Sequence, residues 1–562
     1  MTHALASEFP PAPRHPPLLR ALVAHRPGPW AWEAAVLALF ATVVPFLALN
    51  AIVGRSAGLL AVAGGFAVVY GIGEPSARRL RISSAAGLAI VAGVTLFSAV
   101  AGSPWIAAVL IAVVAGLATF VIDVARAGQP GMILILIASS IALALPVEPH
   151  QLGQRALWTA AGAGFAIAMT ALSVLAYPAR PYRAAISHAY LQLSRFTGAL
   201  GTPGEDVARH AAAVAVQTAL SLPARDHHEV TRLNHLAEQA DLILDELIGD
   251  RMALINDGGN NSRRDTLAAL AGGKKNRASA AMAGDRPVDA TIAAATRTSH
   301  SKAALAGRSH RRQSRTTLLR DIRRHLIDRH SIARVHAERM AVPTALAAAL
   351  ALGTHMPHWY WVPVSTAAVL QGAHTTMIFH RALQRAAGTL LGIAATAGVL
   401  RLAPNVVGIL AVIAVCMFVA QLFFPRNYGV AVAFVTPLAL LMPELAHPGV
   451  AAQSMGPRAW ETALGATIAL AAAYLFRRPV TITHLTDALQ NAATAAAELD
   501  AAADAPPRAL RAQATHHALD AWQTFDALNA DGLTRTGAHA LWPDVVSTHR
   551  HVFHARAHRP RH

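Results

Sequence analysis

Residues 105–125 read WIAAVLIAVVAGLATFVIDVA, and the 18 positions that precede Asp123 in this stretch carry no charge. An α-helix rises about 1.5 Å per residue, so such a run reaches across most of a hydrocarbon core about 30 Å thick. Comparable runs recur along the chain, which is 54% hydrophobic and only 14% charged. Soluble globular proteins carry roughly 25% charged residues. The sequence therefore predicts an all-α integral membrane protein.

Twelve apolar runs of this kind lie in two sets of six, separated by a long polar stretch. They are found at 31–52, 57–73, 83–102, 105–125, 130–147 and 156–177, and then at 341–355, 359–377, 386–403, 405–424, 428–444 and 460–476. We therefore expect about 12 spans and five domains. The domains are a leader (1–29), a six-span membrane domain (30–177), a helical domain (178–340), a second six-span membrane domain (341–477), and a C-terminal helical domain with a basic tail (478–562).

The positions of arginine predict the orientation, because cytoplasmic loops are enriched in Lys and Arg. With the N-terminus inside, the outer loops of the first half hold only Arg55 and Arg155. Its inner loops hold Arg78, Arg79, Arg81 and Arg126. The second half follows the same rule, so both halves run the same way. Both termini and residues 178–340 are then expected in the cytoplasm.

The two halves also resemble one another at a spacing near 300 residues. The residues that repeat at the head of each sixth span are Arg155, Thr159 and Gly162 in the first half and Arg458, Thr462 and Gly465 in the second. Matching orientation and an even number of spans per half indicate two parallel repeats. Their pseudo-two-fold axis would lie along the membrane normal.

Charge is concentrated in one polar segment. Residues 251–340 hold 19 Lys and Arg against 7 Asp and Glu, which places +12 of the net +17 there. Nucleic acid is not the expected partner, because the basic stretch lacks aromatic residues that stack on bases. Anionic lipid headgroups fit better. Within this region, residues from about 256 to 313 are expected to form a basic irregular linker, since they offer little apolar surface to offset chain entropy.

Three stretches carry a family resemblance. They are WYWVPVSTAAVLQGAHTTMIFHRALQRAAGTLLG (359–392), NYGVAVAFVTPLALLM (427–442) and RAWETALGATIALAAAYLF (458–476). Together they resemble the fusaric-acid-resistance and aromatic-acid-exporter membrane family. The resemblance implies a bacterial inner-membrane exporter of aromatic or other small organic acids that contributes to resistance against toxic compounds. It also implies a periplasmic adaptor protein as partner, while the oligomeric state, a homo-oligomer included, stays open.

An exporter needs a group that binds its substrate. The guanidinium group suits a carboxylate, because its planar fork donates to both oxygens and stays charged at any working pH. The candidate substrate-binding residues are Arg381, Arg385, Arg81, Arg126 and Arg426, of which the first two lie inside the family-like motif. The alternative is that these arginines only set topology and reach toward lipid headgroups.

Proton coupling needs a titratable group near the membrane interior, where such groups are rare. The candidates are Asp123, Glu74 and His374, together with Glu33 and Glu461. Asp123 could instead form an ion pair with Arg126, and His374 could simply lie at the membrane interface. Glu33 and Glu461 stand at predicted span starts, where a carboxylate meets the positive end of the helix dipole.

No GxxxxGK[ST] loop occurs, so we expect neither ATP hydrolysis nor any other enzymatic activity. No cofactor and no metal site are expected, and the single cysteine, Cys416, excludes an intramolecular disulfide. The preferred interpretation is a secondary exporter of organic acids. A passive organic-anion channel and a non-transporting membrane scaffold remain as alternatives.

Overall fold

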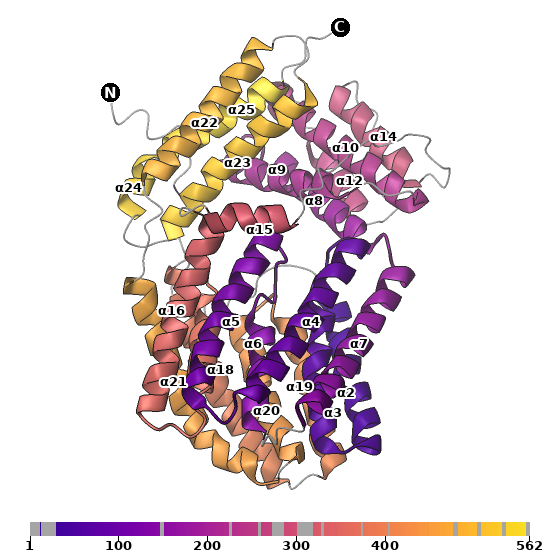
Figure 1. The fold of residues 1–562 in the computed structure, drawn as a ribbon. Coiled ribbons are helices and arrows are strands. Elements are labelled where there is room, and N and C mark those ends of the chain that lie inside the picture. The colour runs from indigo at the N-terminus through magenta and orange to yellow at the C-terminus, as the bar shows by residue number, and fades with distance from the viewer. Residues whose placement is uncertain are drawn as a thin grey trace. The chain divides into compact units, whose positions relative to one another are not determined.

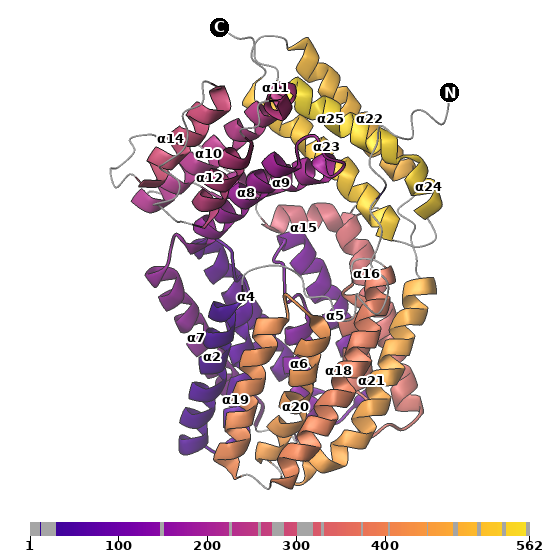
Figure 2. The ribbon, with the colours of Figure 1, turned by 180° about the vertical axis from the view of Figure 1, so that it is seen from behind.

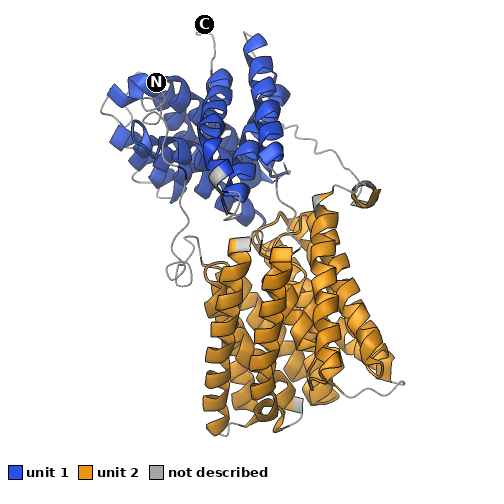
Figure 3. Ribbon diagram, turned by 90° about the vertical axis from the view of Figure 1, so that its left-hand side faces the viewer, with its two compact units in different colours: residues 1–15, 178–314, 479–562 blue, residues 16–177, 315–478 orange. Residues whose placement is uncertain are grey.

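A computed structural model of the chain describes residues 12, 30–145, 151–223, 227–256, 260–272, 286–300, 318–327, 331–372, 375–402, 405–446, 448–475, 482–502, 507–530 and 535–557. These residues form helices and loops, and none of them lies in a strand. The helices fall into two compact units (Figure 3). We call residues 16–177 and 315–478 the membrane unit, and residues 1–15, 178–314 and 479–562 the polar unit.

The membrane unit contains the helices that correspond to the twelve apolar runs (Figures 1 and 2). In the first half these are α2 (Trp32–Ile52), α3 (Arg55–Gly65) with the 3₁₀ helix η2 (Phe66–Val69), α4 (Ser76–Ala99), α5 (Pro104–Ala125), α6 (Ile133–Ala144) and α7 (Leu152–Ala176). After a short helix α15 (Leu318–Ile327), the second half has α16 (Ile332–Gly353), α17 (Trp361–Leu370), α18 (Thr375–Arg401), α19 (Val406–Phe423), α20 (Tyr428–Ala446) and α21 (Val450–Leu475).

Seven of these helices are long and apolar enough to cross a bilayer, namely α2, α4, α5, α7, α18, α19 and α20. The helices α3, α6 and α17 have 11, 12 and 10 residues, so each covers only about half of a hydrocarbon core. The helices α16 and α21 are long, but they carry charged residues such as Glu338 and Arg458. The chain is therefore a multi-pass membrane protein, and the arrangement of 12 spans stays a prediction.

Helices at equivalent positions of the two halves make equivalent contacts. In the first half α7 packs against α3 and α4, and α6 packs against α4; in the second half α21 packs against α17 and α18, and α20 packs against α18. Between the halves, α5 packs against α16, while α19 packs against α2. Each half thus places its first helix on the fourth helix of the other.

Two glycines allow the sixth helix of each half to approach the short second helix closely. A Cβ on Gly162 would lie 1.8 Å from the carbonyl oxygen of Ala61, and one on Gly465 would lie 2.6 Å from that of Val362. Small residues at such positions let helix backbones meet in membrane proteins. The short helix of each half is therefore fixed against a long one.

The polar unit joins two segments that are far apart in the sequence. The first holds α8 (Arg180–Ala199), α9 (Glu205–Ser221), α10 (His228–Gly249), α11 (Arg251–Asn256), α12 (Asn260–Ala271) and α14 (Pro287–His300). The second holds α22 (Ile482–Ala501), α23 (Arg508–Ala530), α24 (Arg535–Ala540) and α25 (Trp542–Ala557). Both contribute to one apolar core, in which Leu236 and Leu244 are buried together with Leu499 and Phe553. The sequence suggested two separate domains, whereas the structure unites these segments.

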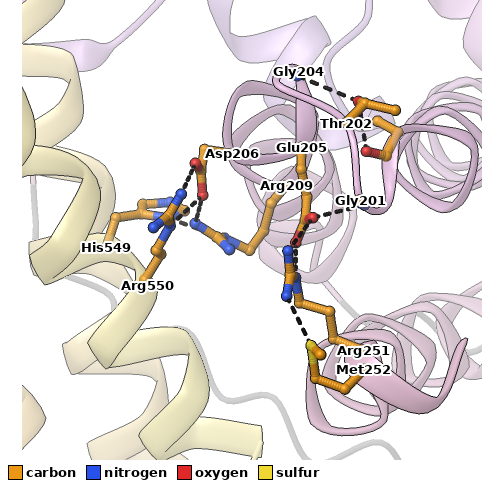
Figure 4. Close-up of polar contacts among 11 residues, drawn as sticks. Gly201, Thr202, Gly204, Glu205, Asp206, Arg209, Arg251, Met252, His549 and Arg550 are labelled. Carbon is orange, nitrogen blue, oxygen red and sulfur yellow. Dashed lines mark hydrogen bonds and ion pairs between the residues drawn. The ribbon is translucent and has the colours of Figure 1, made fainter. Parts of the chain in front are cut away.

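Buried ion pairs reinforce the contact between the two segments (Figure 4). Asp206 of α9 accepts hydrogen bonds from Arg209 and from Arg550 of α25, the latter at 2.9 and 2.6 Å. Burial alone would raise the pKa of Asp206, but the hydrogen bonds and charges of Arg550 and Arg209 hold it below its ordinary value. Arg556 of α25 likewise donates to Asp241 of α10.

The expected irregular linker at about 256–313 was wrong for two of its segments, which form α12 and α14. Arg263 and Asp289 make a buried bidentate pair between these helices, with N–O distances of 2.7 and 2.9 Å. Leu267, Val288 and Ile292 are buried beside them. The composition of the segment hid this packing, because the carboxylate that neutralises Arg263 lies 26 residues away. Residues 257–259, 273–285 and 301–317 lie outside the described residues.

Candidate functional site

Arg385 joins three helices of the second half. Its side chain is on α18 and is 6% exposed. One Nη atom donates to the Tyr428 hydroxyl of α20 at 3.1 Å, and the other donates to Ser365 Oγ of α17 at 3.2 Å. Its Nε has no hydrogen-bond partner among the described residues. Both acceptors are hydroxyl groups, so they orient the guanidinium without neutralising its charge.

Arg381 lies one turn before Arg385 on the same helix and contacts the same tyrosine. Its guanidinium carbon is 4.2 Å from the centre of the Tyr428 ring. Its Nη2 is 3.5 Å from Oε1 of Gln371, the residue that follows the last turn of α17. Arg381 and Arg385 therefore share a face of α18, as their spacing of four residues predicts.

A third arginine, Arg458 of α21, lies at the other end of α17. Its guanidinium carbon is 3.7 Å from the ring centre of Trp361, the first residue of α17. The side chain is 4% exposed, and its Nε and Nη1 have no hydrogen-bond partner among the described residues. Arg458 is also close enough to Arg385 for their charges to interact.

These contacts place three arginines along one short helix. Arg458 contacts Trp361 at its start, Arg385 contacts Ser365 one turn later, and Arg381 contacts Gln371 at its end. From Trp361 to Gln371 the helix rises about 15 Å, or roughly half of a hydrocarbon core. We call Arg381, Arg385 and Arg458 the arginine ladder.

The ladder meets the first half of the membrane unit at its Gln371 end. Gln371 Nε2 donates to the carbonyl oxygen of Pro130 at 3.4 Å, in the loop between α5 and α6. Tyr70, which follows η2 in the first half, donates its hydroxyl to the neighbouring carbonyl of Gly131 at 2.8 Å. The ends of the two short helices, one from each half, thus contact the same loop.

The other predicted substrate-binding arginines do not join Arg381 and Arg385 at Tyr428. Arg81 is exposed and donates to the Ala77 carbonyl of its own helix at 3.2 Å. Arg126 is exposed at the end of α5. Arg426 stacks on Trp30, with 3.9 Å between the guanidinium carbon and the ring centre. These contacts fit the alternative in which the three arginines set topology.

The proton-coupling candidates have other surroundings than the sequence indicated. Asp123 lies 2.9 Å from His336 of α16 and not in an ion pair with Arg126. The reason is local, because Arg126 ends α5 with a left-handed φ of 49°, which turns its side chain off the helix face. Glu74 pairs with Arg78 at 2.9 Å on a partly exposed surface. His374 lies outside the described residues.

Ser365, Tyr428 and Arg458 were not among the predicted site residues, and for Glu461, one of the proton-coupling candidates, the sequence offered the helix dipole as the alternative. Glu461 is not at a helix start, since α21 begins at Val450, eleven residues earlier. The helix dipole therefore does not account for it, whereas Glu33 does lie in the first turn of α2. The signal for Arg458 was present in the chain, because Arg155 and Arg458 stand at equivalent positions just before the sixth apolar run of each half. Among the described residues, no three His, Cys, Asp or Glu side chains are grouped closely enough to hold a metal ion.

Comparison with known proteins confirms the family resemblance. Residues 345–472, from α16 to α21, match the model of the fusaric acid resistance protein-like family. The chain is 26% identical over 486 residues to the uncharacterized membrane protein YvaC of Bacillus subtilis (strain 168), covering 82% of this chain and 75% of that protein. It is 32% identical over 146 residues to the uncharacterized protein slr1298 of Synechocystis sp. (strain ATCC 27184 / PCC 6803 / Kazusa), covering 25% of this chain and 19% of that protein. No solved structure matches the chain.

Proposed function

We propose that this chain, whose second membrane half matches the fusaric acid resistance protein-like family, is a secondary exporter of aromatic or other small organic acids. It would act in the inner membrane of a bacterium, with both termini in the cytoplasm, and contribute to resistance against toxic compounds. A periplasmic adaptor protein and anionic lipid headgroups are the partners that we propose beside the substrate.

The observation that carries the proposal is the arginine ladder. A charge inside a membrane protein is costly unless a partner compensates it. Arg385 is buried and its hydrogen bonds go to the hydroxyl groups of Tyr428 and Ser365, which carry no charge. A substrate carboxylate would supply the missing negative charge, and the guanidinium fork would bind both of its oxygens. The ring of Tyr428, already beside Arg381, offers an aromatic face to an aromatic acid.

We also propose that the membrane unit consists of two parallel six-helix repeats that cross the membrane about 12 times. The equivalent contacts within each half and the reciprocal pairs α5 with α16 and α2 with α19 support a pseudo-two-fold relation. In this arrangement α3, α6 and α17 would cross together with the irregular segments next to them. Interrupted helices of this kind form the substrate sites of many secondary transporters.

Arg385→Lys tests the role of the ladder in binding. Lysine keeps the charge that a topology determinant needs but loses the planar fork. Since a hydrogen bond to a charged group is worth roughly 1.5–3 kcal/mol, the affinity for an aromatic carboxylate should fall about ten- to a hundred-fold. The measurement is the concentration dependence of phthalate transport in proteoliposomes, because the phthalate dianion does not cross bare vesicles.

Arg401→Lys is the matched control, because Arg401 is the exposed last residue of the same helix and its substitution should leave the affinity unchanged. Wild-type affinity of Arg385→Lys at normal abundance would return Arg385 to the topology determinants. Transport that persists when every ion gradient is collapsed would favour a passive channel. If the wild-type protein moves no organic anion, a membrane scaffold becomes the better interpretation.

A further inference from the structure

Glu461 lies beside Arg458, at one end of the arginine ladder, and its carboxylate is not fully hydrogen-bonded. Its side chain is 1% exposed. Oε2 is 3.9 Å from Nη1 of Arg458, and Oε1 is 3.7 Å from Nδ1 of His358, the residue three positions before α17. Both distances exceed the range of about 2.7–3.2 Å for N–H···O hydrogen bonds. Oε1 has no hydrogen-bond partner among the described residues.

We propose that Glu461 is the proton-binding group of the substrate site, and that it takes up a proton when an organic anion binds to the arginine ladder. This inference rests on the proposed function. Without substrate, the carboxylate of Glu461 is, among the described residues, the negative charge that pairs with Arg458, and it compensates the charge of this arginine in part. An anion at the ladder would take over this role, and Glu461 would then be a buried carboxylate without compensation, a state that is costly. Proton uptake removes that charge.

The packing gives protonation a direct route to the ladder. Arg458 and Glu461 lie three residues apart on α21, and their charges interact with each other and, through Arg458, with Arg385. On α17, Thr366 donates its hydroxyl to the Gly465 carbonyl of α21 at 3.0 Å, next to the serine that holds Arg385. A change in the charge of Glu461 therefore acts directly on the charge of Arg458, and through Arg458 on that of Arg385.

Four groups around Glu461 bear on its titration. Arg458 is on the same helix, His358 and Tyr360 lie in the segment before α17, and Arg385 of α18 acts through Arg458. His358 is the one that could take the proton instead, because an imidazole ring can bind a proton on its free nitrogen. Replacing His358 by Asn removes this second proton acceptor and leaves Glu461 in place.

The contrast with the first half supports a specialised role. Arg155, the counterpart of Arg458, has hydrogen-bond acceptors on Ser98, Ala142 and Leu145 at 3.4–3.5 Å. The position that corresponds to Glu461 is Trp158, so the repeat itself does not require a carboxylate there. Glu461 is a feature of the half that carries the ladder.

The test measures phthalate binding to the purified full-length protein in detergent between pH 6.5 and pH 8, where phthalate is already a dianion and exchanges no proton of its own. Linkage requires that an anion whose binding takes up one proton loses up to tenfold in affinity for each unit of rising pH. Wild type should show this fall, and a weakly buffered solution should lose close to one proton per bound anion. Glu461→Gln, which mimics the protonated carboxyl, should bind with a pH-independent affinity and take up no proton.

The controls separate the possible results. Glu338→Gln removes an exposed carboxylate that pairs with Arg334 on α16 and should keep the wild-type pH dependence. Unchanged proton uptake in Glu461→Gln would overturn the inference, as would its loss in His358→Asn with Glu461 intact. Absence of phthalate binding to wild type at every pH would instead refute the proposed function. Glu461→Asp, which keeps a titrating group, should retain proton uptake, and phthalate binding by Glu461→Gln itself shows that this variant is folded.

Discussion

Gly465→Ala is the substitution that best tests the packing around the ladder. A Cβ at this position would lie 2.6 Å from the Val362 carbonyl oxygen and 2.7 Å from Ser365 Cβ. The nearest atom belongs to the backbone of α17, so no flexible side chain can move aside. A van der Waals contact of about 3.4 Å requires α17 to retreat by about 0.8 Å, and overpacking of this kind costs about 1–3 kcal/mol.

Gly398→Ala provides the comparison, because Gly398 lies inside the long helix α18 and a Cβ there meets no heavy atom within 4 Å. Both substitutions gain about the same helix propensity, up to roughly 1 kcal/mol, so their difference isolates the contact with α17. In thermal unfolding of the purified protein, the midpoint of Gly465→Ala should lie roughly 2–6 °C below that of Gly398→Ala, at about 2 °C per kcal/mol for a large domain.

The same movement should also affect substrate binding. The hydrogen bond from Arg385 to Ser365 is already 3.2 Å long, so a retreat of α17 would break it. Phthalate affinity should therefore fall in Gly465→Ala and stay unchanged in Gly398→Ala. Equal unfolding midpoints and equal affinities in the two variants would refute the close approach of α17 and α21, and with it the geometry assigned to the ladder.

Two further predictions concern the polar unit. Arg263→Ala should lower the free energy of unfolding by about 3–5 kcal/mol, because it leaves Asp289 buried without its partner. Arg264→Ala removes an exposed ion pair and should change the free energy of unfolding by less than about 1 kcal/mol. Thermal unfolding measures both variants, and equal effects would contradict the packing of α12 on α14. Burial, with a smaller contribution from Arg209, lowers the pKa of His210 to about 4, so its neutral form stabilises the folded unit above pH 6.5 and this contribution is lost as the pH falls toward 4. His210→Gln should therefore lose less stability than wild type between pH 7 and pH 5, and a parallel pH profile would show that His210 is not buried as described.

The sequence predicted the positions of the helices well, because lipid burial requires long apolar runs and each of the twelve runs coincides with a helix. It overestimated their lengths at α6 and α17, which have 12 and 10 residues and cover only part of the apolar runs at 130–147 and 359–377. The sequence was less informative about which charged residues are buried. Arg458 resembles an outer-loop arginine in the sequence, and its burial depends on Trp361, which is 97 residues earlier. Such a partner leaves no local pattern.

The composition of the polar unit has a consequence for the order in which the chain is made. Residues 315–478 separate its two segments, so at 5–20 residues per second the ribosome needs roughly 10–30 s to reach the second segment after completing the first. During this interval Asp206 cannot yet pair with Arg550, and the apolar faces of α9 and α10 are not yet covered by Phe553. The nascent chain must therefore be shielded while its second membrane half inserts. A transcript that ends before codon 479 would yield a protein that lacks the second segment, so this apolar surface would stay uncovered. Cellular proteases act on such incompletely folded chains.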